Sequence, residues 1–175
     1  MPVRLATFKG YDLFSSVVTA FSLGNPGVHT EVWFNEFRIS TFERRTGCVS
    51  VIPLDESIDE SDWYLTDIPI NDPLQAFRFI EEAMHSPATY NYCVPEFALP
   101  KSLLNRIDPD LDCQRPHTWK NLFCSQFALL FLRRCAMAGI LDLDAERCRL
   151  LWSVNSKGCL PARLKIIAEN VFCTK

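Results

Sequence analysis

The strongest constraint on the fold is a succession of short strand-like segments in the first half of the chain. Residues 3–8 alternate weakly, and four further segments rich in β-branched and aromatic residues follow: residues 28–34, 37–42, 48–53 and 63–69. Helical spacing of apolar residues marks residues 11–21, 73–84, 122–137 and 161–171, with Gly139 as the expected stop of the third helix. Strands grouped together and flanked by helices are typical of the α+β class. We therefore expect one domain over residues 1–175, in which a small antiparallel sheet or barrel packs against helices.

Composition narrows the class of protein further. At 175 residues the chain is long enough to bury a core, and its net charge of −3 gives no electrostatic footprint for nucleic acid. The longest apolar run, Phe127 to Leu132, is too short to span a bilayer, and residues 1–10 lack the apolar stretch of a signal peptide. We expect a cytoplasmic protein without stable membrane insertion.

The chain has eight cysteines, but their spacing does not indicate a metal site. No C-x-x-C pair is present, and the nearest approach to a cluster is Cys113, His117 and Cys124, a spacing that matches no common zinc module. Without a signal peptide, reduced thiols in a cytosol are expected rather than disulfides. We expect no metal ion and no other cofactor.

Cys124 is the cysteine with the most unusual position, in the first turn of the strongly apolar helix. Asn121 is suited to be the N-cap, which would make Cys124 the third helical residue. The unpaired N–H groups and the positive end of the helix dipole then favour a thiolate at this place. The alternative is that Cys124 is a small buried apolar residue, since free cysteine is among the most buried types.

His29 lies on a predicted strand far upstream of Cys124. Side chains alternate along a strand, so the apolar set of Val32 and Phe34 shares one face and should meet the main core, whereas His29 and Glu31 share the other. His29 can then point at the start of the Cys124 helix. A thiol at a helix start and an imidazole on a strand are the two halves of a cysteine hydrolase. The alternative is a histidine that faces solvent beside a hairpin.

A thiol–imidazole pair usually has a third group that fixes the ring and its tautomer. If three residues from Asn35 onward form the hairpin loop, His29 pairs directly across from Glu43. If only two residues turn, the nearest polar residue on that face is Ser40. The turn dipeptides do not fix the register, and a carboxylate holds an imidazolium better than a hydroxyl does, which favours Glu43. Glu31 is a weaker orienting candidate that could line a cleft.

Several short segments carry a resemblance to a known family. They are Thr19-Ala-Phe-Ser-Leu-Gly-Asn-Pro-Gly-Val-His29, Glu43 with Gly47-Cys-Val49, Ala88-Thr-Tyr90-Asn-Tyr92 and Leu122-Phe-Cys124-Ser125-Gln126. Together they resemble the circularly permuted papain-like hydrolases, the His-first, Cys-last branch of the NlpC-type superfamily. The similarity is greatest to the YiiX-like group of bacterial and viral proteins, and more distant to the lecithin–retinol acyltransferases. Gln126 departs from the pattern, because an acidic residue often follows Cys-Ser there.

The resemblance implies a permuted papain-like fold and a cysteine peptidase, amidase or thioesterase. It makes Cys124 the nucleophile, His29 the general base and Glu43 the third position, with the Cys124 backbone N–H stabilising the oxyanion. Glu31, Tyr90, Tyr92 and Ser125 are the candidates for contacts with a peptide, amide or acyl-ester substrate. The alternatives are a lipid acyltransferase, a non-catalytic papain-like binding or virion module, and a zinc-binding module.

Overall fold

The structure is a computed structural model that describes residues 2–10, 27, 29–41, 49–55, 58–85, 124–154, 156 and 159–173. Several predictions therefore fall outside the described residues: the helix at residues 11–21, the capping role of Asn121, and the site residues Glu43, Tyr90 and Tyr92.

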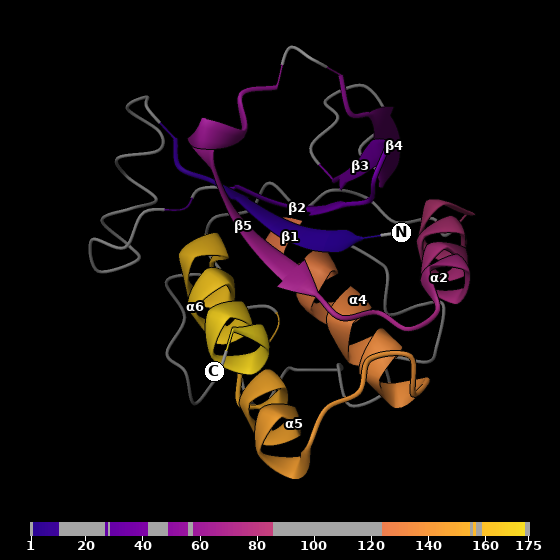
Figure 1. Ribbon diagram of the computed structural model, residues 1–175, viewed down its shortest axis with the longest axis vertical. Coiled ribbons are helices and arrows are strands. Elements are labelled where there is room, and N and C mark those ends of the chain that lie inside the picture. Colours follow the sequence, from indigo (N-terminus) through magenta and orange to yellow (C-terminus); the bar gives the residue numbers. More distant parts are fainter. Residues whose placement is uncertain are drawn as a thin grey trace.

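Five strands form an open antiparallel sheet in the order β4–β3–β2–β1–β5 (Figure 1). The strands are β1 (Val3–Phe8), β2 (His29–Trp33), β3 (Phe37–Ser40), β4 (Ser50–Pro53) and β5 (Trp63–Ile68), with a short 3₁₀-helix, η1 (Glu60–Asp62), before β5. Each strand predicted from the sequence is present. The sequence left open a small antiparallel sheet or a barrel, and the structure has the sheet. β1 lies between β2 and β5, and Phe8 pairs with both His29 and Trp63.

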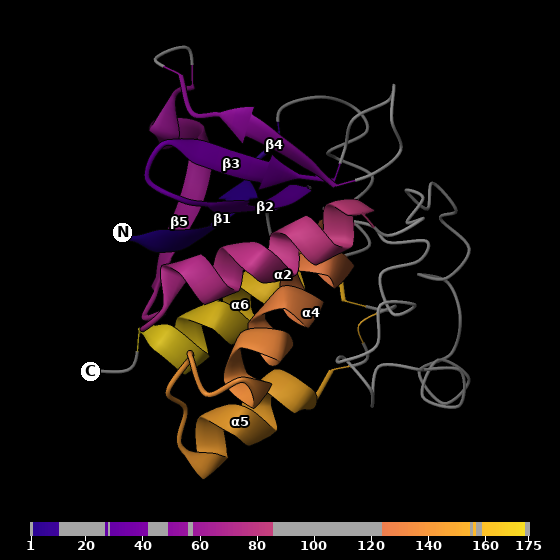
Figure 2. The ribbon, with the colours of Figure 1, turned by 90° about the vertical axis from the view of Figure 1, so that its right-hand side faces the viewer.

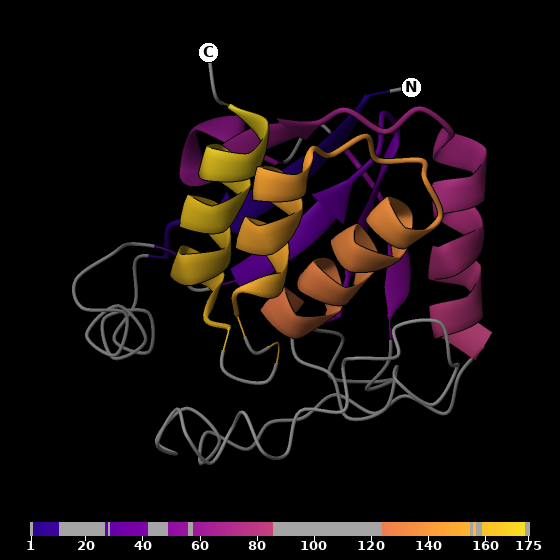
Figure 3. The same cartoon turned by 90° about the horizontal axis from the view of Figure 1, so that it is seen from below.

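The helices gather on one side of this sheet (Figures 2 and 3). They are α2 (Pro73–His85), α4 (Cys124–Met137), α5 (Ala145–Trp152) and α6 (Pro161–Phe172). α4 packs against β2, α6 packs against β1 and β5, and α5 lies farther from the sheet against α4 and α6. No described helix combines the length and the apolar character that crossing a bilayer requires. The α+β prediction is confirmed.

The main core fills the space between the sheet and the helices. Val32 and Phe34 belong to it, as the alternation along the His29 strand predicts, and α4 is buried along nearly its whole length. α4 ends where expected: Gly139 has a φ of 71°, and the N–H of Ile140 donates to the carbonyl of Cys135 at 3.1 Å. Because α4 packs against β2, α2, α5 and α6, its first described residue is held beside β2.

Candidate active site

The structure brings together two side chains that lie nearly a hundred positions apart in the sequence. His29 begins β2, and Cys124 is the first described residue of α4, which packs against β2. The imidazole of His29 and the thiol of Cys124 are hydrogen-bonded to each other. Cys124 is 5% exposed, and the side chain of His29 is 19% exposed. The pair therefore lies just below the surface, where a bond between thiol and imidazole is shielded from water.

Each member of the pair changes the ionisation of the other. Burial by itself lowers the pKa of His29, but the charge of Cys124, their hydrogen bond and the contact with Glu31 raise it to about 10. Burial by itself raises the pKa of Cys124, but His29 and the backbone N–H groups of Thr30 and Ser125 lower it below its ordinary value. A raised pKa of His29 and a lowered pKa of Cys124 together favour a thiolate beside an imidazolium.

A second buried thiol shows that burial is not what lowers the pKa of Cys124. Cys159 is fully buried, and burial raises its pKa to about 12. Burial raises the pKa of the Cys135 thiol as well, and Cys135 is also fully buried. Among the described residues, no imidazole acts on the pKa of either thiol. The contact with His29 is therefore what distinguishes Cys124 from the other buried thiols described.

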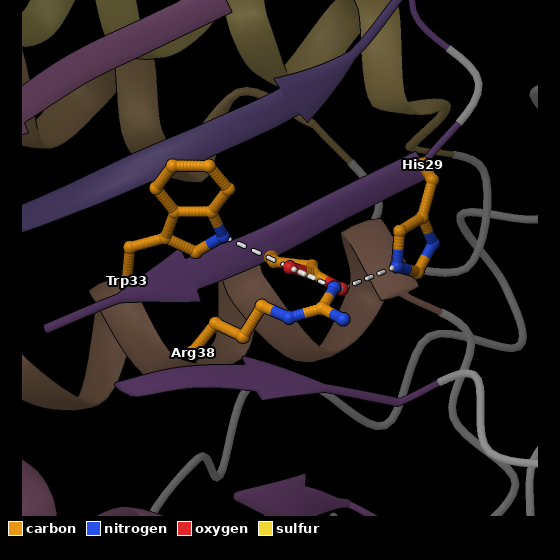
Figure 4. Close-up of polar contacts among 4 residues, drawn as sticks. His29, Trp33 and Arg38 are labelled. Carbon is orange, nitrogen blue, oxygen red and sulfur yellow. Dashed lines mark hydrogen bonds and ion pairs between the residues drawn. The ribbon is translucent and has the colours of Figure 1, made fainter. Parts of the chain in front are cut away.

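The His29 ring also contacts a carboxylate (Figure 4). Nε2 of His29 lies 3.2 Å from Oε1 of Glu31, which follows two residues later on the same face of β2. The indole N–H of Trp33 donates to Oε2 at 2.9 Å, and Nη1 of Arg38 contacts Oε1 at 2.9 Å and Oε2 at 3.2 Å. Glu31 is 1% exposed. Burial raises the pKa of Glu31, but these partners outweigh burial and lower it.

Of the two roles that the sequence suggests for Glu31, orienting His29 and contacting substrate, these contacts fit the first. The sequence favours Glu43 as the orienting group, but the carboxylate that contacts His29 in the described residues is that of Glu31. It is buried and bonded by three side chains. The position of Glu43 lies outside the described residues.

The hairpin register explains why Arg38 reaches Glu31. Val32 pairs with Ile39 and Trp33 with Arg38, and the N–H of Phe34 donates to the carbonyl of Phe37 at 2.8 Å. This is the register with a two-residue loop, and not the three-residue loop that would set Glu43 opposite His29. Arg38 and Trp33 were not singled out from the sequence, because their closeness depends on this register.

Ser125, which the resemblance makes a candidate for substrate contact, lies in the interior at the start of α4. Its side chain is fully buried, and its hydroxyl donates to the backbone carbonyl of Cys159. The hydroxyl therefore ties the start of α4 to the segment before α6. The neighbouring Gln126 is buried as well, and its side-chain amide donates to the hydroxyl of Ser156 at 3.3 Å.

The chain enters β2 through a close approach at Gly27. Its φ of 139° is one that other residues rarely adopt, and an added Cβ would lie 2.9 Å from Cγ2 of Thr7 and 3.2 Å from the backbone of Ala162. Gly27 thus sits against β1 and the first turn of α6, two residues before His29. A side chain there must displace one of these elements or the start of β2.

We expect Gly27→Ala to lower the free energy of unfolding by about 2 kcal/mol more than Gly139→Ala does, because overpacking adds to the backbone strain. Gly139 is a matched control: it also has a positive φ, but nothing lies within 4 Å of an added Cβ. Urea unfolding of both variants measures the difference. Equal losses would contradict the close packing at Gly27.

Among the residues that the structure describes, no group of three or more His, Cys, Asp or Glu side chains could hold a metal ion. Cys113 and His117, which formed the sequence candidate with Cys124, lie outside those residues. Comparisons of the chain with protein-family models, with curated proteins and with solved structures gave no match. The resemblance to the permuted papain-like hydrolases therefore stays a prediction from short motifs.

Proposed function

We propose that the protein is a cysteine hydrolase that cleaves an amide, a peptide bond or an acyl ester through an acyl-enzyme on Cys124. The observation that carries the proposal is the contact between the Cys124 thiol at the start of α4 and the His29 imidazole at the start of β2. The thiolate is the nucleophilic form of cysteine, and a neighbouring imidazolium both stabilises it and holds the proton that a leaving group needs.

In the proposed reaction the sulfur of Cys124 attacks the carbonyl carbon, and the carbonyl electron pair moves to the oxygen. The backbone N–H groups at the first turn of α4 are suited to stabilise this oxyanion. Collapse of the intermediate breaks the bond to the leaving group, which takes the proton from His29. Neutral His29 then accepts a proton from water as the water oxygen attacks the thioester carbonyl. The second intermediate collapses with cleavage of the C–S bond, which releases the acid product and returns Cys124 as a thiolate beside protonated His29. The same acyl-enzyme can also transfer its acyl group to an acceptor other than water.

Glu31 serves this reaction as a positioning residue. Its contact with Nε2 of His29 leaves Nδ1 as the ring nitrogen available to the sulfur and the leaving group. A buried carboxylate beside the ring also balances the charge of the imidazolium, which a low-dielectric surrounding would otherwise disfavour. His29, Glu31 and Cys124 therefore have the relation of base, orienting group and nucleophile found in catalytic triads.

The test is to find where an acyl group becomes attached. The full chain is mixed with an activated p-nitrophenyl ester, quenched in acid within the first turnover, and mapped by peptide mass spectrometry. We expect acylation of Cys124 and not of Cys173, which is exposed and serves as the internal control. The thioester should disappear on longer incubation as product forms. An adduct that forms no faster on Cys124 than on Cys173 would contradict the proposal.

A further inference from the structure

The carboxylate of Glu31 is bound more completely than the orientation of one imidazole requires. Two donors besides His29 converge on it: the indole N–H of Trp33 and the guanidinium of Arg38, which bonds both oxygens through Nη1 (Figure 4). Arg38 comes from β3 and is 25% exposed, whereas Glu31 is 1% exposed. A carboxylate this deeply buried is costly to ionise unless a cation and hydrogen bonds accompany it.

The donors are themselves held in place. Trp33 is fully buried, and its ring centroid lies 5.0 Å from that of Trp63. Its indole N–H therefore fixes Oε2. With Arg38 spanning both oxygens, Oε1 is directed at the His29 ring.

We propose that Arg38, aided by the indole of Trp33, is a positioning residue that keeps Glu31 ionised and aimed at His29, so that the Cys124–His29 pair stays reactive in mildly acidic solution. The inference rests on the proposed function only in that Cys124 and His29 must be the reacting pair. Arg38 touches neither the sulfur nor the imidazole in any described contact; it acts through the carboxylate.

Arg38 acts on Cys124 through two intermediate side chains, Glu31 and His29. Among the described residues, the charged or titratable groups that act on Glu31 are His29 on its own strand and Arg38 on β3, and Cys124 of α4 is linked to it through His29. Without Arg38, one of the groups that lower the pKa of Glu31 against burial is gone, so the carboxylate takes up a proton at a higher pH than in the wild type. A neutral Glu31 no longer balances the imidazolium, so the thiolate–imidazolium pair is lost at a higher pH than in the wild type.

The experiment measures the rate at which iodoacetamide alkylates Cys124 as a function of pH, resolved by peptide mass spectrometry because the chain has eight cysteines. For Arg38→Met we expect the acidic limb of this profile to move up by about one pH unit, the size typical of losing one nearby charge. Arg38→Lys keeps the charge and should restore much of the wild-type limb. Trp33→Phe removes a donor without removing a charge and should shift the limb in the same direction.

Arg4→Met is the matched control. Arg4 stacks on the same indole, but its ion pair is with the exposed Glu60 at 3.0 Å and not with Glu31. We expect its profile to match that of the wild type. An unchanged limb in Arg38→Met, or an equal shift in Arg4→Met, would overturn the inference while leaving the proposed function intact. If Arg38→Met does not fold, an unchanged limb in Trp33→Phe has the same meaning. A wild-type Cys124 whose limb lies in the range of an ordinary thiol would overturn the proposed function and this inference together.

Discussion

His29→Ala is expected to lower the rate of hydrolysis of an activated ester by at least about 10³-fold, because it removes both the proton carrier and the partner of the thiolate. Cys124→Ala is expected to reduce the rate to that of the uncatalysed background. Combining the two changes should cost little more than Cys124→Ala alone, since nucleophile and base act as one unit. Steady-state release of p-nitrophenol measures all three.

His85→Ala is the control for these variants. His85 is exposed at the end of α2, and no described contact joins it to Cys124 or Glu31. Its activity should equal that of the wild type. Activity in His29→Ala within about tenfold of wild type would rule out general acid–base catalysis by this histidine, whose usual contribution is far larger.

His29→Ala should also change how the reactivity of the Cys124 thiol depends on pH. In the wild type we expect reactivity to rise at a pH well below the ordinary thiol range and to change again near 10, where His29 loses its proton. In His29→Ala the Cys124 thiol stays buried and the imidazolium is gone. The pH at which its reactivity rises should therefore move to about 8.5 or above. The position of the limb is the diagnostic quantity, because the nucleophilicity of a thiolate falls as its pKa falls and partly cancels the gain in rate.

Glu31→Gln is the second change with a large expected effect. When His29 is protonated, a glutamine offers one oxygen and one NH₂ group to three side chains that all donate, so at least one donor must face another. The charges of Arg38 and His29 lose their common partner. Breaking a buried pair costs up to about 5 kcal/mol, and because Arg38 is 25% exposed we expect a loss of about 2 kcal/mol in the free energy of unfolding.

Activity should fall in Glu31→Gln as well, by about 10²-fold or more, because the imidazolium is no longer balanced and the ring is no longer fixed by a carboxylate. Glu60→Gln is the matched control, since Glu60 pairs with Arg4 on the surface and is 52% exposed. That variant should stay within about 0.5 kcal/mol of the wild type and keep its activity. Equal stability losses in the two variants would contradict the account of Glu31 as a buried partner of His29.

Much of the fold could be predicted because its signals are local. The alternation along β2 correctly assigned Val32 and Phe34 to the core, and Gly139 correctly marked the end of α4. α5 was missed because its only buried residue is Leu151, so the helix has no apolar stripe to detect. Its start did carry a signal, since the side chain of Asp144 accepts from the N–H groups of Glu146 and Arg147.

The candidate site was predicted less completely. Cys124 and His29 were paired from complementary chemistry and from resemblance, and no local pattern specifies a contact between segments so far apart. The role of Glu31 depends on Arg38 and Trp33, which converge on it only in the two-residue hairpin register. Asn35-Glu36 is not a strong turn dipeptide, so the sequence left that register open. Whether Ser125 faces a ligand or the core depends on the helix's tertiary neighbours, which periodicity does not identify.

The most direct measurement is a pH titration of the ultraviolet absorbance of the Cys124 thiolate. The signal is the absorbance of the wild type minus that of Cys124→Ala at each pH. Cys159→Ala is the control, and it should leave the titration of Cys124 unchanged. A difference signal that is already complete at neutral pH, with its midpoint well below about 8.5, is the predicted result. A midpoint at or above that value would mean that Cys124 is an ordinary thiol, and the account of an activated nucleophile would be wrong.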